Sequence, residues 1–378
     1  MLAPNKYYSY NIGELPRGCQ YCVRGEKLVV FATGLCPRKC YFCPISDQKY
    51  NQDVTYANER KIEQDSDLLL EADFMQAKGA GITGGDPLME LKRTTDYIIK
   101  LKQKYGSNFH IHLYTSLNLV TETALQQLYQ AGLDEIRFHL DLESTKLWPK
   151  LELARKFSWK VGVELPLLPT KKQELIQLLE FIKDKVDFLN LNELEIADNS
   201  MSKLGEMGFK TKDTTSYAIA DSMETGLQII DYVQSHHYSL PVHVCTAKLK
   251  DAVQLANRLK RESQRVRRPF DIVSKEGMLT RGALYHPELV PGFGYRKKLE
   301  TVDKDDYIQQ LLPLLEKIKK RLKLNDEEIC LDAAKPRIIF SSKLIKNNRS
   351  FFKKLNLIPA IVSEYPTADQ LEIEVELF

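Results

Sequence analysis

The sequence lacks any long apolar run. Its longest purely apolar stretches, of which residues 28–32 are typical, are far shorter than the roughly 18 residues that a membrane-spanning helix needs. The N-terminus also lacks the order of a charged segment followed by an apolar one that marks a secretory signal. We therefore expect a cytoplasmic protein with no membrane partner.

Internal repeats, low-complexity segments and a strong excess of one charge are absent too. The 378 residues are 43% apolar and 28% charged, which is enough to bury the core of one large domain and a smaller one. The formal net charge of +3 is unevenly distributed, since residues 246–356 carry 26 Lys and Arg against 14 Asp and Glu. The remainder has 28 basic against 37 acidic residues, so the two parts are expected to meet different partners.

Between residues 28 and 245, short β-rich runs alternate with longer amphipathic stretches. This alternation predicts repeated β-α units and a parallel sheet. We expect an α/β fold, a partial (β/α)6 TIM-type barrel over residues 28–246, preceded by an N-terminal extension at residues 1–27. The predicted strands are 28–33, 80–83, 110–115, 135–140, 161–167, 188–191 and 241–245.

The sequence pattern changes after residue 246. Residues 247–378 predict a small α+β accessory region, with a hairpin over 272–284 and an amphipathic helix over 307–324. Residues 285–305 contain prolines and glycines without a clear period, so we expect a loop there.

The cysteines are seven in number, and five of them lie within residues 19–43. In a cytoplasmic chain such clustering favours metal or iron–sulfur ligation over disulfides. Cys36, Cys40 and Cys43 have the spacing Cys-x3-Cys-x2-Cys, and a loop with three thiolates can hold three irons of a [4Fe–4S] cluster, leaving the fourth iron open. A structural zinc site is the alternative, but it normally has four Cys or His ligands, and no fourth ligand lies nearby.

This motif, with the aromatic Phe42 before its third cysteine, resembles that of the radical S-adenosylmethionine (SAM) superfamily. The resemblance covers roughly residues 28–245 and implies a radical SAM barrel in which Cys36, Cys40 and Cys43 hold a [4Fe–4S] cluster. It also implies that SAM binds the fourth iron through its amino and carboxylate groups. An external electron donor would then drive formation of a 5′-deoxyadenosyl radical, which abstracts a hydrogen atom from the substrate.

The segment Gly84-Gly85-Asp86-Pro87 follows the second predicted strand, where the superfamily has a glycine-rich motif ending in an acidic residue and proline. The glycines allow close approach of the backbone to the amino group of SAM, and Asp86 is expected to accept hydrogen bonds there. The superfamily more often has Glu at this position. Thr115 and Ser116 end the third strand and are expected to contact the ribose or carboxylate of SAM, a helix cap or turn being the alternative.

Polar residues also end later strands, on the face of a barrel where catalysis occurs. His139 and Asp141 flank the end of the fourth strand, and we expect His139 to be catalytic and Asp141 to contact the cofactor. The alternative for His139 is an inward-facing residue of a filled barrel layer. Glu193, after the sixth strand, is the second catalytic candidate, and Glu164 and Asn192 could point into the same cavity.

Cys19 and Cys22 have the spacing of a metal knuckle, and Cys245 ends the last predicted strand. With Cys330 or His243, they are candidate ligands of an auxiliary iron–sulfur cluster or zinc. Cys22 lies near the lower end of the first strand and Cys245 at the upper end of the last, about 20 Å away at ~3.3 Å per residue. Shared ligation therefore requires the N-terminal segment to cross the open side of the barrel. Otherwise these are buried free thiols.

A dense basic stretch at residues 248–268 follows the barrel. It is either the solvated face of a helix or a phosphate-contacting surface, as in an enzyme that modifies RNA. Three functions are therefore open: a radical SAM enzyme acting on RNA such as tRNA, one acting on a small molecule or peptide with an auxiliary metal, and a non-catalytic metal protein that binds nucleic acid. The basic residues are Lys248, Lys250, Arg258, Lys260, Arg261, Arg265, Arg267 and Arg268.

Overall fold

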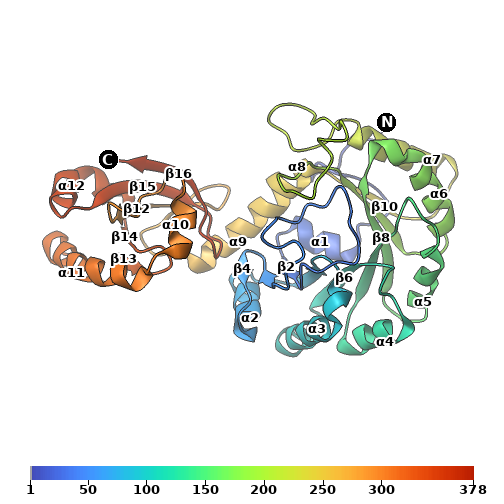
Figure 1. The fold of residues 1–378 in the computed structure, drawn as a ribbon, viewed down its shortest axis with the longest axis horizontal. Coiled ribbons are helices and arrows are strands. Elements are labelled where there is room, and N and C mark those ends of the chain that lie inside the picture. Colours follow the sequence, from blue (N-terminus) through green and yellow to red (C-terminus); the bar gives the residue numbers. More distant parts are fainter. Residues whose placement is uncertain (1) are drawn as a thin grey trace. The chain divides into compact units, whose positions relative to one another are not determined.

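The computed structural model describes residues 2–378 and divides the chain into two compact units (Figure 1). The first, here called the barrel unit, ends at Arg258, and the C-terminal unit is Leu259–Phe378. Residues 2–27, expected as a separate extension, contribute a strand and a helix to the barrel unit.

The boundary between the units lies later than expected from the sequence, where it was placed after residue 246. The reason is that the intervening residues bond back to the barrel unit. The side-chain amide of Asn257 donates to the carbonyl of Val23 at 2.8 Å, and Arg258 forms an ion pair with Glu59 at 2.6 Å.

The barrel unit is built on one curved sheet. Among the described residues, seven of its strands run parallel in the order β10-β9-β8-β7-β6-β5-β2. Each begins and ends within two residues of a predicted strand, so the predicted barrel is confirmed. The strands are β2 (Lys27–Phe31), β5 (Gly79–Thr83), β6 (His110–Ser116), β7 (Glu135–His139), β8 (Lys160–Leu167), β9 (Phe188–Glu193) and β10 (Val242–Cys245).

The barrel is partial because its two edges do not pair with each other. At one edge β1 (Tyr10–Ile12) runs antiparallel to β10, and at the other β2 is followed by β3 (Tyr56–Ala57) and β4 (Arg60–Lys61). Short antiparallel strands thus complete both edges of an open sheet.

Within residues 2–378, helices or helical turns fill each of the six connections between the parallel strands, which explains the (β/α)6 pattern followed by a seventh strand. Alternate strand residues pack against these helices: Ile136 and Phe138 of β7 are fully buried in the core, while Arg137 between them points to the opposite, inner face. The helices are α2 (Asp65–Phe74), α3 (Leu91–Tyr105), α4 (Glu122–Ala131), α5 (Leu151–Ala154), α6 (Lys172–Ile182) and α7 (Ser222–Ser235).

Helix α1 (Arg17–Val23) lies inside the curve of the sheet, where Figure 1 shows it surrounded by strands. It contacts β2, β5 and β6, and a side chain at Gly18 would collide with those of His112 and Arg137. The helix can sit there because Gly18 lets its backbone approach these inward-facing side chains. The N-terminal segment therefore enters the barrel, the condition under which Cys19, Cys22 and Cys245 were expected to share a site.

Beyond β10, the chain forms a short helix α8 (Ala247–Leu249), a π-helical turn η4 (Lys250–Leu255) and helix α9 (Ala256–Val266). The π-helical turn packs against α1. Such turns are rare and are frequent at functional sites.

The C-terminal unit is an antiparallel sheet with helices, as the predicted α+β region requires. Within residues 259–378 the strands are ordered β13-β14-β12-β15-β16, with β11 beside β12. The predicted loop at 285–305 is wrong in part, because a helix forms at Tyr295–Thr301 and buries Tyr295 and Leu299. The elements are β11 (Ile272–Val273), β12 (Leu279–Tyr285), α10 (Tyr295–Thr301), α11 (Lys304–Leu322), β13 (Ile329–Asp332), β14 (Arg337–Phe340), α12 (Ser342–Lys354), β15 (Ile358–Glu364) and β16 (Glu372–Leu377).

Candidate functional site

A cavity of about 880 Å³, here called the main cavity, opens at the carboxyl ends of the parallel strands and continues inward to α1. This is the face of a barrel where active sites form. Most of the residues predicted for the site line the main cavity, but Asp86 and Asp141 are not among them. Those that do are Cys19, Cys22, Cys36, Cys40, Phe42, Cys43, Gly84, Gly85, Thr115, Ser116, His139, Glu193 and Cys245.

The loop that follows β2, here called the cysteine loop, carries the three free thiols of Cys36, Cys40 and Cys43. A turn brings the N–H of Cys43 to the carbonyl of Cys40 at 3.1 Å, and the N–H of Arg38 donates to the sulfur of Cys36 at 3.4 Å. Burial raises the pKa of the Cys36 thiol to about 11, so the free thiol is neutral and a bound metal would be needed to hold it as a thiolate.

The donor set of this loop fits an iron–sulfur cluster. Three thiols line one wall of the main cavity and leave one iron without a protein ligand. Among residues 2–378, no three His, Cys, Asp or Glu side chains are gathered around one point as in an occupied metal site, and this applies to these thiols too.

Residues 84–86 follow β5, and this segment, here called the glycine loop, lies directly against the cysteine loop. The N–H of Gly85 donates to the carbonyl of Thr33, and that of Asp86 to the carbonyl of Leu35, both at 2.8 Å. Gly84 has φ of +147°, and a side chain there would collide with the carbonyl of Thr33. Glycine is therefore required for the two loops to meet and form one wall of the cavity.

Asp86 has a different set of partners from the one expected. Its buried carboxylate accepts hydrogen bonds from the Thr115 hydroxyl at 2.7 Å, from the Ser116 hydroxyl at 2.7 Å and N–H at 3.1 Å, and from the N–H of Leu88 at 3.1 Å. These donors come from the chain itself, and the carboxylate does not border the main cavity. The geometry therefore gives Asp86 the task of fixing the ends of β5 and β6, while Thr115 and Ser116 border the cavity.

Phe42 and His139 form an aromatic wall between the cysteine loop and β7. Their rings are stacked with centroids 5.8 Å apart, and Arg38 donates to the His139 carbonyl at 3.1 Å. Burial and then the charge of Arg38 lower the pKa of His139 to about 3, so the ring is neutral. Asp141 borders a separate cavity of about 300 Å³ and pairs with Arg38 at 3.5 Å.

Glu193 is buried at the end of β9 and bound on both sides. One carboxylate oxygen accepts the N–H of Ala247 at 2.7 Å, and the other pairs with Lys212. Lys212 comes from the long loop 194–221, so Glu193 joins this loop to the start of α8 at the edge of the main cavity.

The same loop also covers the cysteine loop. The side-chain amide of Asn199 donates to the carbonyls of Cys43 at 2.9 Å and Ile45 at 2.8 Å, and the N–H of Lys203 donates to the carbonyl of Tyr41 at 2.6 Å. These bonds hold the backbone around Cys43 in place from the outside.

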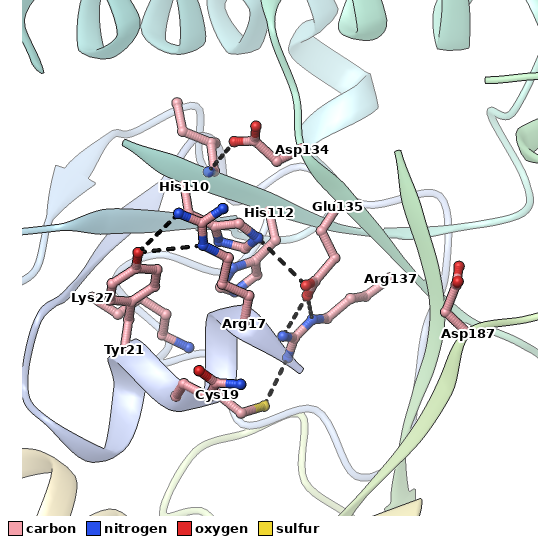
Figure 2. A network of polar contacts seen from close by, with 12 residues as sticks. Arg17, Cys19, Tyr21, Lys27, His110, His112, Asp134, Glu135, Arg137 and Asp187 are labelled. Carbon is pink, nitrogen blue, oxygen red and sulfur yellow. Dashed lines mark hydrogen bonds and ion pairs between the residues drawn. The ribbon is translucent and has the colours of Figure 1, made fainter. Parts of the chain in front are cut away.

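Sequence reasoning missed Arg137, a fully buried cation on the inner face of β7. Figure 2 shows it between Glu135 and Cys19. It pairs with Glu135 at 2.5 Å and Glu164 at 2.7 Å and donates to the sulfur of Cys19 at 3.5 Å. The signal was present in the sequence, because Glu135, Arg137 and His139 alternate with Ile136 and Phe138, a pattern that places charged residues inside a barrel.

Glu164 reaches the cavity as expected, but it is fully engaged. It accepts hydrogen bonds from Asn190 at 2.9 Å and Asn192 at 3.0 Å in addition to its pair with Arg137. Burial alone would raise its pKa, yet the charge of Arg137 and the two amides outweigh this and lower the pKa of Glu164 to about 2.

The basic stretch after β10 is partly used within the barrel unit. Lys248 lies over the ring of Tyr8 at 4.2 Å, and Lys250 pairs with Glu195. Arg258 is paired with Glu59, and Arg261 and Arg265 also interact with other residues, so at least five cations of this stretch have partners in the chain. None of the helices formed by residues 2–378 combines the length and hydropathy that crossing a bilayer requires.

Comparison with known proteins identifies relatives of the whole chain. The model of the radical SAM superfamily matches residues 30–156. A Methanocaldococcus jannaschii protein, provisionally named as a glycyl-radical enzyme activating enzyme, is 37% identical over 98% of this chain and 94% of its own length.

Solved structures with some likeness to the chain are more distant. Coproporphyrinogen III oxidase from Escherichia coli, described as a radical SAM enzyme, is 12% identical over 89% of this chain and 92% of its own, with a TM-score of 0.36. The radical SAM methyltransferase TsrM from Kitasatospora setae, solved with tryptophan and a SAM analogue, is 13% identical over 72% of this chain and 59% of its own, with a TM-score of 0.37.

Proposed function

Because the chain belongs to the radical SAM superfamily, whose enzymes use a [4Fe–4S] cluster and SAM, we propose that it activates a partner protein by removing a hydrogen atom from a backbone glycine. The observation that carries this proposal is the 37% identity, over nearly the full length of both chains, to a protein named for that activity.

Family membership excludes one of the three functions left open by the sequence. The radical SAM fold, the enzyme class and the two cofactors predicted from Cys36, Cys40 and Cys43 are confirmed. The reading of the chain as a non-catalytic metal protein is therefore wrong. An RNA substrate gains no support from the comparisons.

The cysteine and glycine loops are the parts of the chain that fit the cofactors. Cys36, Cys40 and Cys43 would hold the cluster, and Gly84 and Gly85 present backbone beside it without a side chain in the way. When bound, cluster and SAM supply a 5′-deoxyadenosyl radical, formed as one electron from an external donor breaks a carbon–sulfur bond of SAM, and this radical takes a hydrogen atom from the substrate.

The residues around the cysteine loop shape the walls of the main cavity. The neutral ring of His139 stacked on Phe42 offers a wall without charge, and loop 194–221 covers the cysteine loop from outside. Helix α1 closes the cavity from within the barrel. These walls would hold the target carbon near the radical and limit the access of water to it.

The test uses anaerobically reconstituted protein with dithionite, SAM and a fractionated extract, and it measures 5′-deoxyadenosine. We expect stimulation by a protein fraction that protease destroys and RNase does not, together with the electron paramagnetic resonance doublet of a glycyl radical. The variant C36A serves as the negative control and C330A as the matched variant that retains activity.

Two other results would overturn the proposal. Stimulation that is abolished by RNase would identify an RNA substrate, and stimulation by a protein-free filtrate would identify a small molecule. If no fraction stimulated formation of 5′-deoxyadenosine, hydrogen abstraction from a partner would itself be contradicted.

A further inference from the structure

Three cysteines outside the cluster motif come from two neighbouring elements that line the main cavity. Cys19 and Cys22 lie three residues apart on α1 and therefore on one face of that helix, and Cys245 ends β10. Val23 at the end of α1 packs with Cys245 and Leu249, so the two elements touch. All three thiols line the main cavity.

Side-chain N–H donors are directed at two of these sulfurs. Asn190 donates to Cys19 at 3.1 Å and Arg137 donates to it at 3.5 Å, while Gln254 donates to Cys245 at 3.9 Å. A neutral thiol is a weak acceptor, whereas metal-bound thiolates are held by outer donors of this kind. Burial raises the pKa of both the Cys19 and the Cys245 thiol, so these donors would support thiolates only when a metal is bound.

A cation without a carboxylate partner lies in the same place. Lys27 lines the main cavity, and in the part of the chain that the structure describes its ammonium has a hydrogen bond only to the hydroxyl of Tyr114, at 3.5 Å. Glu164, the carboxylate whose charge interacts with Lys27, is already paired with Arg137. A thiolate centre beside Lys27 would supply the missing negative charge.

The backbone next to Cys245 is unusual as well. The π-helical turn Lys250–Leu255 carries Gln254, which donates to Cys245, and packs against α1, which carries Cys19 and Cys22. One irregular turn thus contacts both elements that provide the thiols. This matches the frequent use of π-helical turns at functional sites.

From these contacts we infer that Cys19, Cys22 and Cys245 bind a second thiophilic metal centre, Zn²⁺ or an iron–sulfur cluster, in the same cavity as the first. Three protein thiolates leave a coordination position for a substrate, as in catalytic metal sites. Like the cluster cysteines, these thiols are not gathered around one point in residues 2–378.

The test measures metal rather than activity and so is independent of the proposed function. The variant C36A/C40A/C43A, purified without oxygen, is assayed for zinc, iron and sulfide, both as isolated and after reconstitution with iron and sulfide. We expect it to keep one zinc ion or the iron and sulfide of one cluster per chain. Adding C19A, C22A and C245A should remove this metal, and X-ray absorption should show sulfur ligands before but not after.

The matched control is C330A in the C36A/C40A/C43A background, which should keep the residual metal. Circular dichroism shows whether each variant folds, and single Cys-to-Ser variants replace any combination that does not. If the folded C36A/C40A/C43A variant binds neither zinc nor iron, or if its metal survives loss of Cys19, Cys22 and Cys245, the second centre is refuted.

Discussion

Arg137 in the barrel unit and Arg337 in the C-terminal unit are both almost fully buried; Arg137 pairs with two carboxylates and Arg337 with three, the third being Glu372 at 3.9 Å. The guanidinium of Arg337 contacts Asp332 at 2.9 Å and Glu364 at 2.8 Å, and its Nη1 donates to the Tyr285 hydroxyl at 3.0 Å. Neither arginine would be expected inside a protein without such partners.

The two networks differ in what else they touch. Arg137 also donates to the thiol of Cys19 and borders the main cavity, whereas no residue of 259–378 lines that cavity. Buried charge alone therefore does not mark an active site in this protein. The active site is marked instead by the thiols and the open volume beside Arg137.

The largest effect on SAM cleavage is expected from replacing the cluster cysteines of the barrel unit, in contrast to the cysteine of the C-terminal unit. Replacing Cys36, Cys40 and Cys43 by Ala should reduce SAM cleavage to the level without protein, because nothing then holds the cluster. Cys330 of the C-terminal unit should tolerate Ala with unchanged cleavage. Both variants are compared by the rate of 5′-deoxyadenosine formation under dithionite, and cleavage that survives the triple substitution would contradict the site.

The next effect concerns stability. Arg337→Met leaves Asp332 without its ion pair, while Glu364 keeps Arg281 at 3.1 Å, and this should cost about 3–5 kcal/mol of unfolding free energy. Arg137→Met should cost less, about 1–3 kcal/mol, because Glu164 keeps the amides of Asn190 and Asn192.

Thermal unfolding of these two variants, followed in parallel with SAM cleavage, measures the difference. We expect Arg337→Met to lower stability more and Arg137→Met to lower activity more. The reverse order would show that the two networks have been assigned the wrong roles.

The contribution of Glu164 to the stability of the barrel unit should depend on pH. Its pKa is lowered from 4.5 to about 2, so its charge stabilises the folded state above the ordinary pKa, and this contribution is lost as the pH falls through about 2. The wild type should exceed Glu164→Gln in stability by about 3 kcal/mol near neutral pH. Unfolding temperatures should converge between about pH 4.5 and pH 2, and a constant gap would contradict the low pKa.

The smallest effect is expected at Asp86. Asp86→Asn replaces a carboxylate oxygen with an amide group facing the Ser116 donors, so about 1–3 kcal/mol should be lost where β5 and β6 end. The affinity for SAM should fall only through this local loosening. Equilibrium binding of SAM, with hydrogen exchange at Ser116, measures both, and an unchanged exchange rate would contradict the structural role.

Much of this arrangement could be predicted from local sequence. The parallel strands alternate with amphipathic helices, and their residues alternate between core and interior, so the barrel and the order of its loops follow from periodicity. The cysteine spacing is local too, and it placed Cys36, Cys40 and Cys43 at the cavity. The helix at residues 295–301 was missed because it is only 7 residues long and the glycines and prolines around it are typical of a loop.

The partners of individual side chains could not be predicted in this way. Glu193 lines the main cavity as expected and Asp86 does not, and the carboxylate of each is bound by donors of the chain that the sequence did not indicate. Such pairings join residues from different strands and loops, and their distances depend on how the sheet curves.

The sequence by itself therefore determined the fold class, the cluster motif and the family, because each depends on the spacing of residues along a single segment. Only the tertiary structure decided that α1 enters the barrel and that Arg137, Lys27 and three further cysteines share one cavity with the cluster loop. The physical reason is that closing the sheet around Gly18 brings together side chains that are more than a hundred residues apart.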